Sequence, residues 1–370
     1  MTRSRSTLLA LLVAVGVVTI AAPFDSRGNH TLAQGGQSKP PGTNYKGPAF
    51  TFNKIADGVY HAVGTGSLVV MSNAAVIEGD RDVLVVDSHV SPGGAWALRE
   101  ELKTVTSKPL RYVVNSHFHF DHSHGNQIYG SEVQIIGHEF AREMILAGKS
   151  QDSRARQFFV GAVPGQIESL KKRIAETTDV AQKAQLENQL AIQQNHLEGT
   201  NAVRPTPPNV TLNDRLTLFL GGREVRIMFM GRGHTAGDVI VHLPKERIIA
   251  TGDLLVEGTS YSGDAYIPEW IETLEKVKAL DYDMTLPGHG AAFKGKAKVE
   301  HFQAYLKTLW SEAKRMHDAG VPMEEAAKAI DLRSHAVNYP TIRSVGLVPP
   351  HGVWRVYELL DGKEIKEKLR

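Results

Sequence analysis

The chain has 370 residues, of which 42% are hydrophobic and 22% charged, the composition of an ordinary soluble globular protein. Its length suits one large α/β domain with insertions or two modest domains. The formal net charge is only +2, so the chain does not have the excess of basic residues that is typical of a general nucleic-acid binder. The chain contains no cysteine. It therefore has no disulfides and must hold any metal through nitrogen and oxygen ligands.

Residues 1–33 have the layout of a secretory signal peptide. Two arginines precede an apolar run at 8–22, which is slightly shorter than the roughly 20 residues that span a membrane. Cleavage is favoured over a retained anchor, and the positions after Ala22 and Ala33 are both candidate cleavage points. The sequence therefore predicts a periplasmic or secreted protein that keeps no stable membrane span and is formally neutral after cleavage.

A polar linker rich in glycine and proline is expected at 34–48, followed by a folded domain at 49–300. Its first part alternates short β-branched runs with a helical stretch near 95–106, a pattern typical of half an α/β sandwich. The strands of this half are predicted at 83–87, 111–115 and 133–136.

Residues 139–197 are rich in Gln, Lys, Glu, Ala and Leu at helical spacing, and they predict a helical insertion in the domain. A cap at Thr178 or Asp179 would divide the insertion into a helical hairpin, and one long helix is the other interpretation. A lid over the active site and an exposed excursion for packing or dimerisation are equally favoured.

The second half of the domain repeats the alternation of strands and helices. Its strands are predicted at 216–220, 225–230, 239–243 and 247–251, and its helices at 269–280 and 301–317. Residues 301–370 are expected to form a C-terminal helical extension on the same domain. Two similar halves with an insertion between them favour one continuous sandwich over two independent domains.

Four potential metal ligands lie within six residues, directly after a predicted strand. His117 and His119 are two residues apart in an extended segment, so their side chains point the same way and can bind one ion. Asp121 and His122 lie beyond the turn and could serve a second ion nearby. Imidazoles and a carboxylate set this close need partners when buried, which favours a metal site over an unconnected polar loop.

Three further segments each follow a predicted strand and deliver one potential ligand. The glycines of the segment 231–238 allow a sharp turn that brings a histidine close to a crowded centre. The ligands from these segments are His234, Asp253 and His289.

In this order, the four segments resemble the metallo-β-lactamase superfamily, which includes glyoxalase II-like enzymes and lactonases, over about residues 60–290. The resemblance implies a four-layered αβ/βα sandwich with a metal cleft where the halves meet. It implies one ion held by His117, His119 and His234, and a second held by Asp121, His122 and His289. Asp253 would bridge both ions, and Asp87 would support the ligand segment through hydrogen bonds without binding metal.

The chemistry of these ligands agrees with two ions, expected to be zinc, with iron or manganese as alternatives. Three imidazoles leave a tetrahedral position open, while imidazoles with carboxylates give the second ion a harder environment. Two ions about 3.5–4 Å apart would hold a bridging hydroxide as the nucleophile. Asp121 is the predicted catalytic residue, which would orient this hydroxide and relay its proton to the leaving group.

The remaining residues near these motifs have mainly structural interpretations. His124 and His138 are expected to serve packing, although His124 could support the centre by a hydrogen bond. Arg232 either steers an anionic substrate or pairs with a structural carboxylate. Three aromatic residues after the predicted bridging ligand are candidate pocket walls, the last of which fits the core better: Tyr261, Tyr266 and Trp270.

The ligand set fixes the reaction type better than the substrate. The leading prediction is hydrolysis of an ester, lactone, thioester or amide-like bond in a small molecule, with β-lactamase activity as its nearest rival. One large group of β-lactamases has a cysteine at the position of Asp253, so this group is disfavoured. Quorum-signal lactonases have a tyrosine shortly after the bridging aspartate, whereas no tyrosine directly follows Asp253 in this chain. A single-iron persulfide dioxygenase and a non-enzymatic periplasmic metal-binding or redox-relay protein are the alternatives from other classes. Homo-oligomerisation is left open.

Overall fold

The structure, a computed structural model, describes residues 38–347 and 350–363. The predicted signal peptide at 1–33 and the first part of the predicted linker lie outside the described residues. None of the described helices is both long enough and apolar enough to cross a membrane.

Seven strands form the first sheet in sequence order, β1 to β7. Strands β1 to β4 pair antiparallel, whereas β4 to β7 pair parallel. The strands span Phe50–Ala56 (β1), Val59–Gly64 (β2), Ala74–Glu78 (β3), Val83–Val86 (β4), Leu110–Val114 (β5), Gln134–His138 (β6) and Val210–Leu212 (β7).

Six strands form the second sheet in the order β13-β12-β11-β10-β9-β8. All neighbours in it pair antiparallel except β11 and β12, which are parallel. The strands span Arg215–Leu220 (β8), Arg223–Phe229 (β9), Val239–Leu243 (β10), Ile248–Gly252 (β11), Met284–Pro287 (β12) and Phe293–Lys294 (β13).

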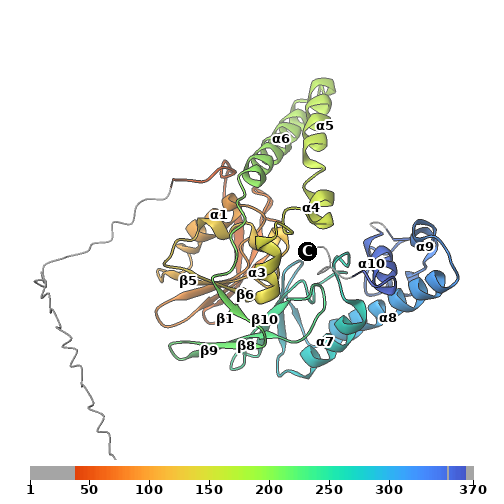
Figure 1. The fold of residues 1–370 in the computed structure, drawn as a ribbon. Helices are drawn as coiled ribbons and strands as arrows, with labels where there is room; N and C mark the ends of the chain where they lie inside the picture. Colours follow the sequence, from red (N-terminus) through yellow and green to blue (C-terminus); the bar gives the residue numbers. More distant parts are fainter. Residues whose placement is uncertain (1–37, 348–349, 364–370) are drawn as a thin grey trace, which may run out of the picture. The chain divides into compact units, whose positions relative to one another are not determined.

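The two sheets face each other across one apolar core and carry helices on their outer faces (Figure 1). Side chains alternate between the faces of a strand, so in β4 Leu84 and Val86 point into the inter-sheet core, while Val85 packs outward against helix α1 (Pro92–Leu102). The predicted αβ/βα sandwich is therefore confirmed. Ser91 caps α1 and Pro92 occupies its first turn, which is why this helix begins before the predicted residue 95.

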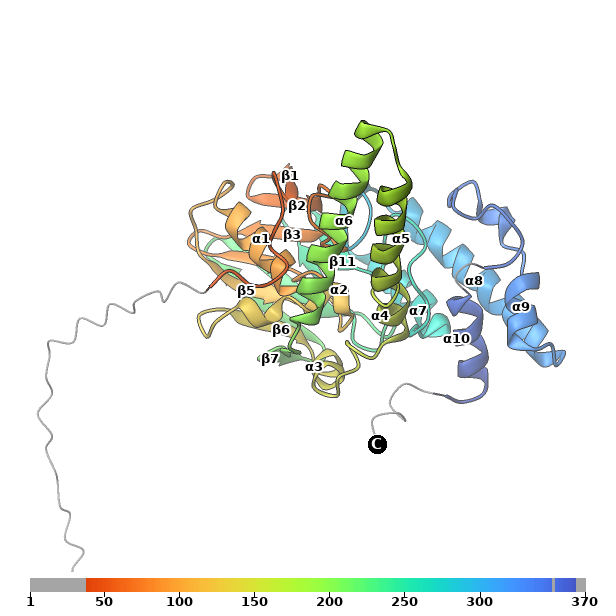
Figure 2. The ribbon, with the colours of Figure 1, turned by 90° about the horizontal axis from the view of Figure 1, so that it is seen from above.

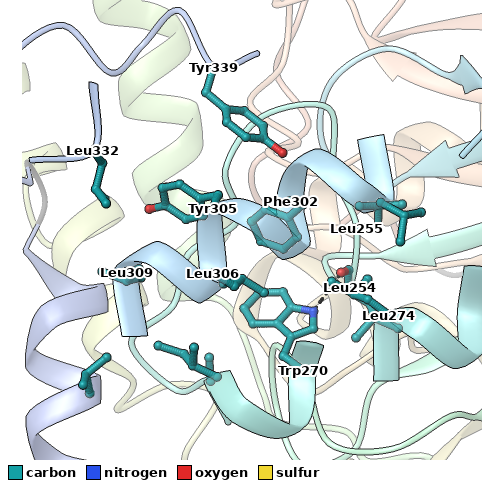
Figure 3. Packing of buried hydrophobic residues seen from close by; sticks show 14 of the residues in the cluster. Leu254, Leu255, Trp270, Leu274, Phe302, Tyr305, Leu306, Leu309, Leu332 and Tyr339 are labelled. Carbon is teal, nitrogen blue, oxygen red and sulfur yellow. Dashed lines mark hydrogen bonds between the residues drawn. The ribbon is translucent and has the colours of Figure 1, made fainter. Parts of the chain in front are cut away.

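Helices α7 (Ile267–Ala279) and α8 (Ala297–Asp318) cover the second sheet. Figure 3 shows Trp270 of α7 at the centre of their packing, where its ring lies 5.1 Å from Phe302 and its indole N–H donates to the Leu254 carbonyl at 3.0 Å. The bond satisfies the indole nitrogen inside the core. Trp270 is thus a core residue, the preferred of its two interpretations.

Four helices lie between β6 and β7, and they span Glu139–Leu146 (α3), Arg154–Phe159 (α4), Val163–Glu176 (α5) and Val180–Asn201 (α6). Helices α5 and α6 run side by side as a hairpin (Figure 2). Asp179 caps α6 by accepting a hydrogen bond from the Gln182 amide at 2.7 Å, so a hairpin forms instead of one long helix. The short helix α4 was not predicted separately, because its start depends on the cap Ser153 within a loop.

After α8 the chain continues through α9 (Met323–Ala329), the 3₁₀ helix η2 (Arg333–His335) and α10 (His351–Leu360). Helices α9 and α10 pack against α8 in the same apolar cluster that contains Trp270. This C-terminal helical region therefore extends the outer layer of the second sheet.

A short turn after β5 carries helix α2 (Phe120–Ser123) and the 3₁₀ helix η1 (Asn126–Ile128). The turn packs so closely on the segment before α1 that a Cβ atom at Gly125 would lie 1.9 Å from the Ser88 carbonyl oxygen. The Ser88 amide also donates to the His122 carbonyl at 2.9 Å. The position of α2 thus depends on a glycine at residue 125.

We expect Gly125→Ala to lower the free energy of unfolding by about 1–3 kcal/mol, because the added methyl group must displace the neighbouring backbone. Gly165→Ala is the matched control, since nothing lies within 4 Å of a Cβ there and the residue is in helix α5. The control should be neutral or stabilising by up to about 1 kcal/mol. Urea unfolding of both variants measures the difference, and equal stabilities would contradict the close approach at residue 125.

Candidate metal centre

The first group of predicted ligands lies where β5 ends and the chain turns into α2. His117, His119, Asp121 and His122 are all buried. The turn is held by its own backbone, since the His122 amide donates to the His119 carbonyl at 3.1 Å. From outside the turn, the Asn115 side chain donates to the His122 carbonyl at 3.0 Å.

His234 lies in the loop between β9 and β10 and is fully buried. Thr235 shapes this loop, because its amide and its hydroxyl both donate to Asp238, at 2.8 and 2.7 Å. The amide of Val239 then donates to the Ser116 carbonyl at 2.8 Å. This bond ties the His234 loop of the second sheet to the ligand segment of the first.

Asp253 and His289 follow the adjacent parallel strands β11 and β12. The carboxyl ends of parallel strands meet at one sheet edge, so their following residues come together. A Cβ atom at Gly288 would lie 2.5 Å from Asp253 Oδ1 and 2.9 Å from His122 Cε1. Only glycine therefore allows the backbone of this loop to approach the cluster so closely.

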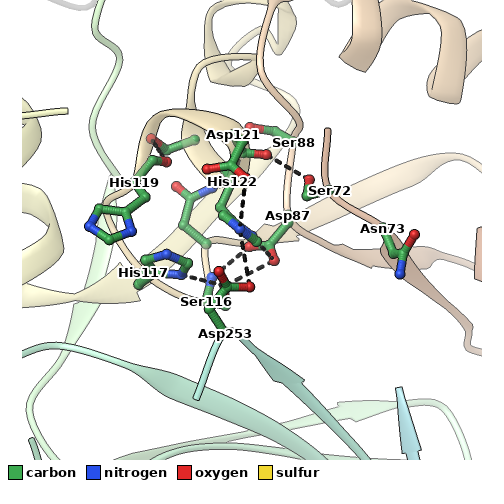
Figure 4. Close-up of polar contacts among 12 residues, drawn as sticks. Ser72, Asn73, Asp87, Ser88, Ser116, His117, His119, Asp121, His122 and Asp253 are labelled. Carbon is green, nitrogen blue, oxygen red and sulfur yellow. Dashed lines mark hydrogen bonds and ion pairs between the residues drawn. The ribbon is translucent and has the colours of Figure 1, made fainter. Parts of the chain in front are cut away.

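The seven predicted ligands form three overlapping groups whose ligand atoms lie within 4.8 Å of one another. The groups are His117, His119 and His234; His117, His122 and Asp253; and Asp121, His122 and His289. Figure 4 shows five of these side chains converging from both halves of the sandwich. The structure thus brings together every residue that the sequence proposed as a ligand.

The donor atoms of the group formed by His117, His119 and His234 are suited to a cation. His234 Nε2 lies 3.0 Å from His119 Nδ1, so two ring nitrogens point at each other. His117 Nε2 is buried and has no hydrogen-bond partner among the described residues. Burial lowers the pKa of His234 to about 3, with the neighbouring His119 adding to the effect, so its imidazole is neutral. Neutral imidazoles are the form that binds metal.

Two carboxylates, those of Asp121 and Asp253, lie next to His289. Asp253 Oδ2 lies 3.3 Å from His289 Nε2, Asp121 Oδ2 lies 3.2 Å from the same nitrogen, and Asp253 Oδ1 has no hydrogen-bond partner among the described residues. Burial alone would lower the pKa of His289, but the two carboxylates outweigh burial and raise it to about 10. A site that favours positive charge this strongly, with oxygen and nitrogen donors, fits a divalent cation.

Asp87, the predicted supporting aspartate, lies behind the ligands. Its carboxylate accepts hydrogen bonds from the Ser116 amide at 2.7 Å and from the Ser116 hydroxyl at 2.9 Å. It also lies 2.8 Å from His122 Nδ1. A bond at Nδ1 leaves Nε2 of His122 facing the other ligands, which fixes the orientation of its ring.

Asp264 is a residue of the site that sequence reasoning missed. Its Oδ2 lies 3.0 Å from Nε2 of His119, on the far side of the ring from the ligand cluster. A hydrogen bond at Nε2 leaves Nδ1 of His119 as the nitrogen that faces His234. The only signal was a carboxylate in the turn Ser262-Gly263-Asp264 after the predicted bridging ligand, and such turns are common without a function.

The other residues weighed from the sequence lie outside the ligand cluster. His124 is buried and neither ring nitrogen has a hydrogen-bond partner among the described residues. His138 caps α3 by accepting from the Phe140 amide at 3.0 Å. Arg232 pairs with the Glu269 carboxylate and lies over the Tyr266 ring, so the structural one of its two interpretations holds.

Tyr261 lies beside the ligands, with its ring centroid 5.9 Å from that of His119. Tyr266, by contrast, is buried among apolar residues together with Phe118 and Phe140. Of the two tyrosines proposed as pocket walls, Tyr261 is therefore the one in a position to meet a substrate.

Comparison with known proteins relates this chain to several enzymes. It is 22% identical over 301 residues to a linear primary-alkylsulfatase of Pseudomonas sp. (strain ATCC 19151), covering 76% of this chain and 54% of the relative. It is 36% identical over 88 residues to metallo-beta-lactamase IND-1 of Chryseobacterium indologenes, covering 22% of this chain and 36% of that protein. The chain thus spans about half the length of the alkylsulfatase.

Among solved structures, a stereoselective inverting sec-alkylsulfatase from Pseudomonas sp. superposes with a TM-score of 0.58 and 17% identity, covering 87% of this chain and 52% of that one. This likeness concerns the fold. The sequence profile described as the Metallo-beta-lactamase superfamily matches residues 68–289, more than half of the chain. The protein therefore belongs to the metallo-beta-lactamase superfamily.

Proposed function

We propose that the protein is a hydrolase that uses two divalent cations, most suitably zinc, to cleave an ester-type bond of a small molecule. The observation that carries the proposal is the position of Asp253 between two donor sets. One of its oxygens lies 3.7 Å from His234 Nε2, and the same oxygen lies 3.3 Å from His289 Nε2. A carboxylate placed between two donor sets can contribute to the binding of two neighbouring cations.

Two bound cations would lower the pKa of a shared water towards neutrality and stabilise the oxyanion of the transition state. The chain's own residues do the rest. Asp87 and Asp264 fix the rings of His122 and His119. The Asp121 carboxylate, 3.5 Å from His122 Nε2, orients the attacking water and carries its proton towards the leaving group.

The substrate class rests on the chemistry of the site and on the relatives. An ester, lactone, thioester or amide-like bond suits a water nucleophile beside an oxyanion site, and β-lactam hydrolysis is a special case of it. A sulfate ester is a second candidate, because similarity to the alkylsulfatase runs over most of the chain while similarity to the β-lactamase covers a short part of it.

The proposal also includes export to the periplasm or the medium, supported by the basic and apolar pattern of residues 1–33. The partner is a small-molecule substrate, and the lack of a basic excess speaks against nucleic acid as a ligand.

We expect the purified protein to contain two metal ions per chain and to lose turnover on chelation, with recovery on addition of zinc, because seven candidate ligands are more than one four-coordinate ion uses. Metal quantification and a panel of 4-nitrophenyl acetate, an aliphatic lactone, nitrocefin and an alkyl sulfate provide the test.

The outcomes of that panel separate the alternatives. Nitrocefin turnover alone would favour a β-lactamase, and alkyl sulfate turnover alone a sulfatase. One iron per chain would favour a persulfide dioxygenase. Full metal occupancy with no turnover of any substrate would contradict the hydrolytic proposal and favour a metal-binding protein.

We expect Asp121→Ala to lower kcat by about 10²–10⁴-fold, the usual contribution of a general acid or base. The fold should persist, because among the described residues the ion-pair partners of the Asp121 carboxylate are the candidate ligands His122 and His289. Steady-state kinetics and melting curves measure the two effects. Asp283→Ala, at an exposed position, is the control, and wild-type rates for the Asp121 variant would refute its assigned role.

We expect Asp264→Ala to weaken metal affinity about 10–100-fold, because loss of a carboxylate that orients a ligand histidine has effects of this size. Competition with a chromogenic chelator measures the affinity without turnover. Asp264→Asn should lose less, since its amide oxygen can still accept from His119 Nε2. Unchanged affinity in both variants would show that Asp264 does not orient the ligand.

A further inference from the structure

Three segments that are distant in sequence contribute aromatic rings to one row, which begins at Tyr261 beside His119. Tyr261 comes from the loop after β11, Phe158 from α4, and His351 with Trp354 from α10. The centroid of Tyr261 lies 5.9 Å from His119 and 4.9 Å from His351. His351 in turn lies 5.5 Å from Phe158 and 5.4 Å from Trp354. We call these four residues the ring wall.

The polar atoms of the ring wall lack acceptors. Tyr261 Oη, Trp354 Nε1 and both ring nitrogens of His351 are buried atoms with no hydrogen-bond partner anywhere in residues 38–347 and 350–363. Buried polar groups in native proteins are nearly always paired. The hydroxyl, the indole and one imidazole nitrogen of a neutral ring are donors, so the wall offers several donors to an acceptor that the described chain does not supply.

The wall is held in place from both sides. Arg154 of α4 pairs with Glu358 of α10, which links the insertion to the C-terminal helix. Arg355 of α10 is buried and donates through Nε to the Ala265 carbonyl at 2.7 Å, which links α10 to the loop that carries Tyr261. A Cβ atom at Gly263 would lie 2.0 Å from Tyr261 Oη, so the tyrosine is seated against a glycine. These contacts fix the rings of the wall relative to one another.

One edge of the wall meets solvent, and the other meets the metal centre. Phe158 is 49% exposed, whereas His351 is 7% exposed. Next to the wall, Ala155 and Val160 pack in one apolar cluster with Phe120 of the ligand turn, and Tyr261 lies against that cluster. The wall therefore extends from the solvent-exposed Phe158 to Tyr261 beside His119.

We propose that the ring wall binds the part of the substrate adjoining the scissile bond, and that it selects an aromatic group carrying an oxygen acceptor such as a nitro or carbonyl group. This inference rests on the proposed function and specifies its substrate class. The rings provide stacking and edge contacts to an aromatic group. The Trp354 indole and the His351 imidazole donate to the acceptor, and a site with unpaired donors discriminates against analogues that lack it.

Binding of three neutral alcohols to the metal-loaded protein tests the proposal by calorimetry. The probes are 4-nitrobenzyl alcohol, benzyl alcohol without the acceptor, and cyclohexylmethanol without the aromatic ring. In the wild type, the nitro compound should bind about three- to tenfold tighter than benzyl alcohol, the equivalent of one hydrogen bond. Cyclohexylmethanol should bind more weakly than either aromatic probe.

Two variants assign the effect to the wall. Trp354→Phe keeps a ring and removes a donor, so it should reduce the preference for the nitro compound; His351→Leu should weaken both aromatic probes. Trp310→Phe and His335→Leu are the matched controls, because they change the same residue types in the C-terminal helices. If His351→Leu does not fold, Trp354→Phe alone carries the comparison.

Equal affinities of the three probes, or equal losses in wall and control variants, would overturn the proposal. Because binding is measured without turnover, its failure is separable from that of the proposed function. If the protein binds the aromatic probes in preference to cyclohexylmethanol but hydrolyses no ester, only the proposed hydrolytic function is contradicted. Where 4-nitrophenyl acetate is turned over, the wall variants should raise KM and leave kcat nearly unchanged.

Discussion

The convergence of four loops on one buried point is the constraint on which this structure depends. Imidazoles and carboxylates removed from water are costly unless they have partners, yet here they face one another. The fold satisfies this requirement from behind, where Asp87 holds Ser116 and His122. It also brings backbone unusually close, through Gly125 on one side and Gly288 on the other. The pairing of strands in the two sheets thus fixes the positions of the loops that carry the candidate ligands.

Two supporting carboxylates, one from each half of the sandwich, orient different histidines of the site. Asp87 belongs to the first sheet and acts on Nδ1 of His122, leaving Nε2 for the ligand cluster. Asp264 follows the second sheet and acts on Nε2 of His119, leaving Nδ1. The two ligand histidines thus present different ring nitrogens, and each orientation is set by a carboxylate that is not itself among the ligands.

The ligands and most strands could be predicted from the sequence because their signals are local. His117 to His122 lie together after a β-branched run, and the later candidates each follow a strand, so their positions mark them as candidate ligands. The resemblance to the metallo-β-lactamase superfamily then implied how they divide between two ions. Asp264, His351 and the short helix α4 could not be found in this way. Their roles depend on contacts between residues far apart in the chain, such as Asp264 with His119 and Arg154 with Glu358. The sequence did not decide between a helical hairpin and one long helix, because the choice depends on a single capping residue, Asp179.

The order of the ligands along the chain has a consequence for assembly during synthesis. The three-histidine group and the contacts that hold its loop are complete once Val239 has been synthesised, whereas the group with Asp121 and His122 waits for His289. A nascent chain thus passes through a stage in which one donor set can close while the other still has an open side. Capture of a first ion at that stage would join the two sheets before the last strands are added, and so make loading of the centre stepwise.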